Sequence, residues 1–196
     1  MSSRFDPASP AGVGACSFPL VDISTPRLLL RAPEHADAAR ISLLAGDYDV
    51  AIMTGTIPHP YSERQAAEWI ESVLSGEEGV VFSILRSGML IGCTGYRAFG
   101  DDHAELGYWI GKPYWGMGYA TEAVRALILY AFEADSFDYL TVGHFADNPA
   151  SARVIAKFGF TPRGKEVRDC AARGARAHCL TYRLDRAQAL ADFRTA

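Results

Sequence analysis

A glycine-rich segment between two predicted elements is the part of this sequence most typical of a binding site. It reads IGKPYWGMGYATEA over residues 110–123, with a strand-like run before it and a helical pattern after it. Backbone N–H groups at the start of a helix have no partner within the helix, and the helix dipole adds partial positive charge there. Gly116 and Gly118 would let an anion approach the backbone closely. Ala120 keeps the first helical turn uncluttered, and Thr121 adds a hydroxyl. The segment therefore predicts a phosphate-binding loop that needs no lysine.

Two other phosphate-binding motifs do not fit this loop. A Rossmann fingerprint needs Gly or Ala three residues after Gly118, where this chain has Thr121. A Walker loop needs Ser or Thr after its Gly-Lys pair, where this chain has Pro113. On this motif alone, an ordinary strand-to-helix turn remains an alternative, with glycine present only for its backbone freedom.

Three further polar residues are candidates for chemistry. Glu105 lies on the strand-like run before the loop and could accept a proton, although a solvated carboxylate near His103 is the competing interpretation. Asn148 and Ser151 lie at the start of a short predicted helix, where small polar residues most often act as caps. The sequence leaves both alternatives open.

The cysteines and histidines predict no metal site. The four cysteines form no C-x-x-C pair, and the five histidines fall in no zinc-ligand spacing. We therefore expect inert thiols in a reducing compartment, which favours the cytoplasm. The cysteines are Cys16, Cys93, Cys170 and Cys179.

The periodicity of apolar residues predicts the elements that position these candidates. One helix begins after Ser62, which forms a capping box with Gln65, and ends at Gly76. The resulting order, β-α-α-β-β-β-α-β-α-β-β, indicates a mixed α/β or α+β domain. The remaining predicted helices are 34–45, 120–134 and 148–157, and the predicted strands are 27–31, 80–85, 89–96, 105–110, 139–145, 162–168 and 177–184.

Length and composition limit the class of protein. The chain has 196 residues, of which 49% are hydrophobic and 21% charged, enough to fill a core and to exclude a disordered chain. Its net charge of −4 gives no overall electrostatic footprint for nucleic acid or an anionic membrane, so we expect neither partner. The longest apolar run, 126–132, is too short to span a bilayer. We expect a flexible extension over 1–24, one domain over 25–186 and a tail over 187–196.

The loop and four further segments of the chain together resemble the GCN5-related N-acetyltransferases (GNAT), in particular the RimJ/RimL-type branch that acetylates ribosomal-protein N-termini. The loop matches the family's acetyl-CoA pattern at Gly118 and Ala120, with Trp115 where Arg or Gln is usual. The resemblance runs from about residue 25 to 184 in the family's order. The other matching segments are TPRLLLR at 25–31, LIGCTG at 90–95 with ELGYWI at 105–110, and NPASARVIAKFGF at 148–160.

The resemblance implies a mixed, mostly antiparallel sheet flanked by helices, in which the fourth and fifth strands splay apart. Pantetheine would lie in that gap, and the acetyl group would pass directly from acetyl-CoA to an amine. The implied catalytic residues are Glu105, as acceptor of the amine's proton, and Ser151, as partner of the leaving thiolate in place of a tyrosine that this chain lacks in the helix at 148–157. The implied residues for binding acetyl-CoA are Trp109, Ile110, Trp115, Gly116, Met117, Gly118, Tyr119, Ala120, Thr121 and Asn148.

The acceptor is the least determined part of this interpretation. An α-amino group has a pKa of roughly 8 and a lysine side chain one near 10.4, so about a tenth of the former is neutral at pH 7. A carboxylate base therefore favours an α-amine, either a protein N-terminus or an amino-acid-like metabolite. A polyamine or antibiotic amine, and a non-catalytic acyl-CoA sensor with the same fold, are the alternatives, and homodimerisation is left open.

Overall fold

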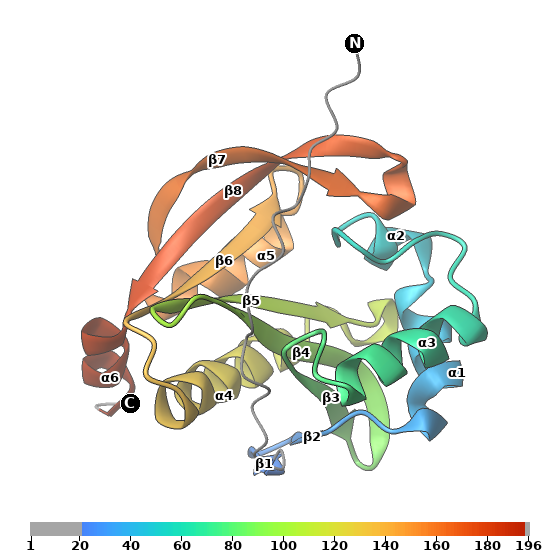
Figure 1. The fold of residues 1–196 in the computed structure, drawn as a ribbon, viewed down its shortest axis with the longest axis horizontal. Helices are drawn as coiled ribbons and strands as arrows, with labels where there is room; N and C mark the ends of the chain where they lie inside the picture. The colour runs from blue at the N-terminus through green and yellow to red at the C-terminus, as the bar shows by residue number, and fades with distance from the viewer. Residues whose placement is uncertain (1–20, 195–196) are drawn as a thin grey trace.

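A computed structural model describes residues 21–194, apart from the side chains at 192 and 194, and shows one eight-stranded sheet with helices on both faces (Figure 1). The strand order is β1-β2-β3-β4-β5-β6-β8-β7. Among the described strands, β5 and β6 form the one parallel pair, and every other neighbouring pair is antiparallel. The predicted mixed, mostly antiparallel sheet is thus confirmed. The strands are β1 (Ile23–Ser24), β2 (Leu29–Arg31), β3 (Val80–Arg86), β4 (Met89–Phe99), β5 (His103–Ile110), β6 (Tyr139–Phe145), β7 (Thr161–Cys170) and β8 (Ala175–Asp185).

The helices divide between the two faces of the sheet. Because side chains alternate along a strand, β5 points Leu106 and Ile110 into the main core with α4, and Trp109 into a second cluster with α1 and α3. The long helices are α1 (Ala38–Ala45), α3 (Glu63–Leu74), α4 (Tyr119–Ala134) and α6 (Arg186–Arg194), and the short ones are α2 (Tyr48–Ala51) and α5 (Pro149–Ile155). Single 3₁₀ turns lie at His35–Asp37, Lys112–Tyr114, Ala156–Phe158 and Ala171–Arg173.

The strands β5 and β6 separate part-way along their length, as expected of the fourth and fifth predicted strands. Their pairing ends at Leu106 and Val142, whereas β5 continues to Ile110 and β6 to Phe145. Beyond that point each strand keeps its other neighbour, β4 or β8. A gap therefore opens within the sheet, with one edge of each strand left without a partner strand.

Both ends of the predicted domain differ from expectation. Residues 1–20 of the expected extension lie outside the described residues, and Ile23–Ser24 already pair with β2. The expected tail forms α6, because Arg186 donates to three backbone oxygens at and beyond the end of α4 and Ala189 is fully buried. A two-residue strand and a nine-residue helix of mixed polarity carry too little periodicity to be assigned from sequence.

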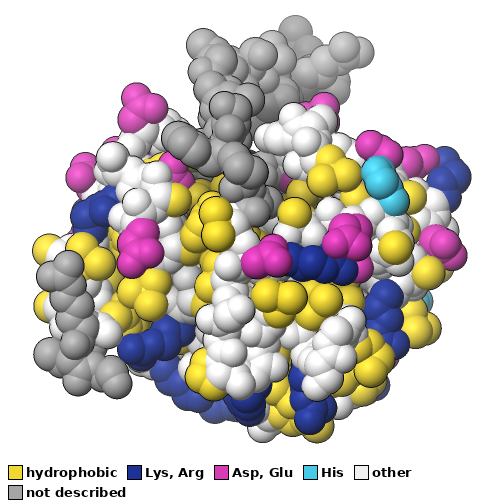
Figure 2. Space-filling model, turned by 90° about the horizontal axis from the view of Figure 1, so that it is seen from below, with side chains coloured by type: hydrophobic (Ala, Val, Ile, Leu, Met, Phe, Trp, Pro, Cys, Tyr) yellow, Lys and Arg dark blue, Asp and Glu magenta, His cyan; other side chains and the backbone are white. Residues whose placement is uncertain are grey.

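The predicted capping box at the start of α3 is confirmed. The Ser62 hydroxyl accepts the Gln65 N–H at 3.3 Å, and the Gln65 side chain accepts the Ser62 N–H at 2.9 Å. Within residues 21–194, no helix is both long and apolar enough to cross a membrane. On the face seen in Figure 2, acidic and basic side chains both lie among hydrophobic ones.

Candidate active site

The glycine loop leads directly into α4 and leaves the start of that helix open. Gly118 is the residue before the helix and has φ +81°, a conformation that L side chains rarely adopt, and Gly116 has φ +73°. Gly118 occupies the N-cap position, where Ser, Thr, Asp or Asn would normally cap the helix, and it has no side chain that could do so. The first N–H groups of α4 therefore point outward without a side-chain cap, as an anion-binding helix start requires.

Two side chains fix the loop in place. The indole N–H of Trp115 donates to the carbonyl oxygen of Ile110 at 2.6 Å, which ties the loop to the end of β5. Arg27 donates to the carbonyl oxygen of Met117 at 2.9 Å and forms an ion pair with Glu122 at 2.6 Å. The loop is thus held from both sides, while Trp115 and Met117 remain about half exposed at its surface.

A lysine also lies beside this helix start, in addition to Arg27. The Lys157 ammonium is 3.3 Å from the Thr121 hydroxyl, at the first turn of α4. Together with the outward N–H groups it provides positive charge suited to a pyrophosphate. The residues present therefore fit the phosphate end of coenzyme A. Of the predicted residues, Tyr119 turns its side chain into the main core, so it could contribute only backbone groups.

The edge of β5 that faces the gap offers backbone hydrogen-bonding groups. The Gly111 N–H bonds to Ile91 on β4, and backbone groups alternate between the two sides of an antiparallel strand. Those of Tyr108 and Ile110 therefore point toward the gap, and those of Trp109 point toward β4. The Trp109 side chain packs in the second cluster, so the structure brings Ile110 rather than Trp109 to the gap.

Asn148 and Ser151 have separate roles at the start of α5. The Asn148 side chain is the cap, because its Oδ1 accepts the Ser151 N–H at 3.0 Å. The Ser151 hydroxyl does not cap the helix. Its Oγ lies 2.7 Å from the phenol oxygen of Tyr108 on β5. The plain-cap alternative thus applies to Asn148, and Ser151 faces β5 where that strand has left β6.

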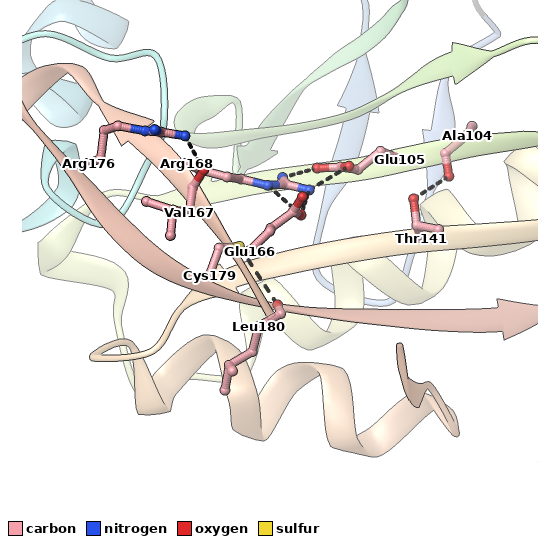
Figure 3. A network of polar contacts seen from close by, with 9 residues as sticks. All are labelled: Ala104, Glu105, Thr141, Glu166, Val167, Arg168, Arg176, Cys179 and Leu180. Atoms are coloured by element: carbon pink, nitrogen blue, oxygen red, sulfur yellow. Dashed lines mark hydrogen bonds and ion pairs between the residues drawn. The ribbon is translucent and has the colours of Figure 1, made fainter. Parts of the chain in front are cut away.

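On the other face of the sheet, Glu105 is held by an arginine from the far edge strand. Arg168 on β7 forms two hydrogen bonds with the Glu105 carboxylate, one of them 3.0 Å between Nη2 and Oε2, and also bonds Glu166 at 2.6 Å and 2.8 Å (Figure 3). The hydrogen bond with Glu105 is the main reason that the pKa of Arg168 is raised above the ordinary value of an arginine. Glu105 is therefore one member of a network of two carboxylates and one guanidinium, which we call the carboxylate clamp.

Gly143 on β6 gives the clamp the room it needs. A Cβ added at this position would lie 2.9 Å from the Cys179 sulfur and 3.3 Å from Nη1 of Arg168. The Arg168 side chain thus crosses β6 over a residue that has no side chain, which is how β7 reaches β5.

The clamp borders the larger of the two cavities described in the structure. Its volume is about 590 Å³, within the usual range for small-molecule sites. It opens over the start of β5, β6 and the edge strand, on the face opposite Ser151. Its lining includes Phe99, His103, Glu105, Thr141, Arg163, Glu166, Arg168 and Thr181.

Sequence reasoning missed three residues of this site. Arg168 and Glu166 appear in the sequence only as part of a charged strand, and nothing local indicates that Arg168 reaches Glu105, which lies 63 residues earlier. Tyr108 could have been placed opposite Glu105 by alternation along the strand, but its bond to Ser151 depends on how α5 packs.

Comparison with known proteins agrees with this geometry. Residues 27–161 match the model of the acetyltransferase (GNAT) domain family. The chain is 30% identical over 154 residues to the uncharacterized N-acetyltransferase YoaA of Bacillus subtilis (strain 168), covering 75% of this chain and 85% of that protein.

Solved acetyltransferase structures share the fold. The ribosomal L7/L12 α-N-protein acetyltransferase RimL, in complex with coenzyme A, superposes with a TM-score of 0.72 at 18% identity over 84% of this chain and 98% of that one. The microcin C7 self-immunity acetyltransferase MccE, in complex with acetyl-CoA and AMP, gives 0.71 at 18% identity over 82% and 93%. The open helix start, the divided sheet and these matches lead to one conclusion: the chain belongs to the GNAT acetyltransferase family and is an N-acetyltransferase.

Proposed function

We propose that this enzyme transfers the acetyl group of acetyl-CoA to an α-amino group, either of a protein N-terminus or of an amino-acid-like metabolite. The observation that carries the proposal is the gap between β5 and β6, which opens just beyond the paired residues Glu105 and Leu106, with Ser151 on one face of the sheet and the carboxylate clamp on the other. A thioester lying in that gap would be open to an amine from the clamp side.

Acetyl-CoA would be held mainly by backbone groups. The outward N–H groups of the first turn of α4, with Lys157 beside Thr121, suit the pyrophosphate. The backbone groups of Tyr108 and the N–H of Ile110 suit the amides of pantetheine, whereas the Ile110 carbonyl oxygen already accepts the Trp115 indole N–H. The Asn148 amide nitrogen is not used in the capping bond, so it can donate to the same arm.

The acceptor would enter through the 590 Å³ cavity beside Glu105. Glu105 and Glu166 line this cavity together with Arg163, Lys165 and Arg168, so a protonated amine would be held by direct contact with a carboxylate and not by the overall charge of the lining. Each carboxylate oxygen can accept more than one hydrogen bond, so Glu105 can still bind an ammonium or a water that removes its proton while paired with Arg168.

An α-amine suits this arrangement better than a lysine side chain. About a tenth of α-amino groups are neutral at pH 7, against roughly one lysine in 2,500. Because the Glu105 carboxylate is already paired with Arg168, we expect faster transfer to an acceptor whose amine loses its proton easily. A similar argument disfavours polyamines.

The test is the rate of thiol release from acetyl-CoA at pH 7 with three matched acceptors. These are a peptide with a free N-terminus, the same peptide blocked at the N-terminus but bearing one lysine, and a polyamine. We expect the first to react at least tenfold faster than the other two. A faster reaction with the blocked lysine peptide or the polyamine would show that the proposed acceptor class is wrong.

A further inference from the structure

The Tyr108 hydroxyl and the Ser151 hydroxyl form a pair at the gap, on the face opposite the clamp. The two oxygens are 2.7 Å apart, and the phenol is also 3.5 Å from the Ser151 carbonyl oxygen, too far for a strong bond. Tyr108 lies just beyond the last residue of β5 that pairs with β6, so it borders the gap. The capping of α5 uses Asn148, which leaves this pair without a role in building the helix.

The relative acidity of the two hydroxyls assigns the donor. A serine hydroxyl has one proton and can accept two hydrogen bonds, and a phenol also has one proton. The phenol is the stronger acid, so it is the better donor and Ser151 Oγ is the acceptor. Burial raises the pKa of Tyr108 to about 12, although the bond to Ser151 acts in the opposite direction, so Tyr108 keeps its proton at neutral pH. The Ser151 proton is then free for a third group.

We propose that Tyr108 is a positioning residue that directs the Ser151 hydroxyl proton toward the sulfur of acetyl-CoA. The proposal rests on the proposed function, together with the role that the family resemblance implies for Ser151 as partner of the leaving sulfur. The phenol fixes the rotation of the Ser151 hydroxyl, and by donating to its oxygen it also makes Ser151 a stronger donor. A tyrosine from a strand would thus serve a step for which the helix at 149–155 offers no tyrosine.

Neither hydroxyl changes its protonation state when the thiolate leaves. As the carbon–sulfur bond breaks, its electron pair stays on sulfur, and Ser151 donates a hydrogen bond to the negative charge. The carbonyl double bond of the acetyl group reforms, and the nitrogen now bound to it gives up its proton to water or to the Glu105 side. Ser151 and Tyr108 both keep their protons.

The experiment is a double-mutant cycle with Tyr108→Phe and Ser151→Ala, in which kcat and the KM for acetyl-CoA are measured with the free-N-terminus peptide. Tyr108→Phe keeps the ring that packs against the core and removes only the hydroxyl. We expect kcat to fall about tenfold while the KM changes less than twofold. Adding Tyr108→Phe to Ser151→Ala should cause no further loss, because the positioned group is already absent.

Tyr96→Phe is the matched control. It removes another buried phenol hydroxyl from the same sheet, one that bonds Asp135 at 2.5 Å and not Ser151. We expect it to leave kcat unchanged, even where it lowers thermal stability.

A second measurement does not depend on turnover. The thiol of bound coenzyme A can be titrated by the absorbance of its thiolate, and this reports only on folded, loaded protein. If Ser151 and Tyr108 stabilise the thiolate, Tyr108→Phe and Ser151→Ala should each shift the titration to higher pH, whereas Tyr96→Phe should not.

The outcomes separate this proposal from the one on which it rests. If Ser151→Ala slows transfer but Tyr108→Phe leaves both kcat and the thiol titration unchanged, the role of Tyr108 is wrong and that of Ser151 stands. Multiplicative effects in the cycle would also contradict it. If Ser151→Ala itself has no effect, the implied role of Ser151 is wrong and this proposal fails with it, while acetyl transfer to an α-amine stands.

Discussion

The two faces of the sheet at the gap differ in charge and in how they are built. On the α5 face, the hydroxyls of Tyr108 and Ser151 are neutral and lie 2.7 Å apart. On the clamp face, Glu105, Arg168 and Glu166 carry three full charges. Transfer from a thioester to an amine needs hydrogen-bond donors where sulfur becomes negative, and carboxylates where an ammonium arrives and loses its proton. The difference between the faces matches that division.

The faces also differ in the reach of their contacts. Ser151 is positioned by a helix start, through a cap three residues away. Glu105 is positioned by Arg168, which is 63 residues further along the chain and crosses β6 at Gly143. Perturbing each face in turn therefore tests whether the division of roles is real.

The largest expected effect is a loss of affinity for acetyl-CoA, the molecule on which both faces are proposed to act. In Gly118→Val, a β-branched side chain at φ +81° strains the loop and blocks close approach of a phosphate, so we expect the affinity for acetyl-CoA to fall about a hundredfold or more. Isothermal calorimetry on the folded variant measures it.

The matched control is Gly76→Val. Gly76 also has a positive φ, +85°, with nothing within 4 Å of an added Cβ, and it lies at the end of α3 away from the loop. It should lose stability but keep its affinity. Unchanged affinity in Gly118→Val would mean that the phosphate site lies elsewhere.

A second prediction concerns acid sensitivity of the helical layer on the clamp face. Burial acts to raise the pKa of Asp37, but hydrogen bonds from Arg31, the Glu34 N–H and Ser83 outweigh it and lower the pKa below its ordinary value. A carboxylate of this kind stabilises the fold above its unfolded pKa, near 3.9, and that contribution is lost as the pH falls through the folded pKa.

Asp37→Asn should therefore lower the free energy of unfolding by about 2 kcal/mol at pH 7 and by much less near pH 2. Urea denaturation at the two pH values measures the difference. Glu68→Gln, which breaks an exposed pair with Arg64, should cost under about 0.5 kcal/mol. An equal cost of Asp37→Asn at both pH values would contradict the prediction.

The smallest effects are expected at the clamp, where Glu105→Gln and then Gly143→Ala sharpen the assignment of the clamp to the acceptor. Since about a tenth of an α-amine is already neutral at pH 7, removing the base should lower kcat/KM for the acceptor by about tenfold. The affinity for acetyl-CoA should not change, because Glu105 lies on the opposite face from Ser151.

Gly143→Ala provides an independent way to disturb the same clamp. The added methyl would crowd Cys179 and Arg168 without altering any charge, so it should lower kcat/KM for the acceptor by a few-fold and leave acetyl-CoA binding intact. If either variant weakened acetyl-CoA binding instead, the division between the two faces would be wrong.

The sequence by itself determined what depends on local order. Helix periodicity and capping predicted α3 and α4, the glycines at 116 and 118 predicted an open helix start, and the order of elements predicted the mixed sheet. These features depend on neighbours within a few residues, where steric and hydrogen-bonding rules act directly.

Only the tertiary structure decided which side chains meet. Strand alternation places Glu105 and Tyr108 on opposite faces, but the sequence does not tell which helix or strand covers each face. Packing of α5 brings Ser151 to Tyr108, and the curl of the sheet brings Arg168 over Gly143 to Glu105. Such contacts form between residues tens of positions apart, where closing the chain costs entropy that only the complete core repays, so no local pattern encodes them.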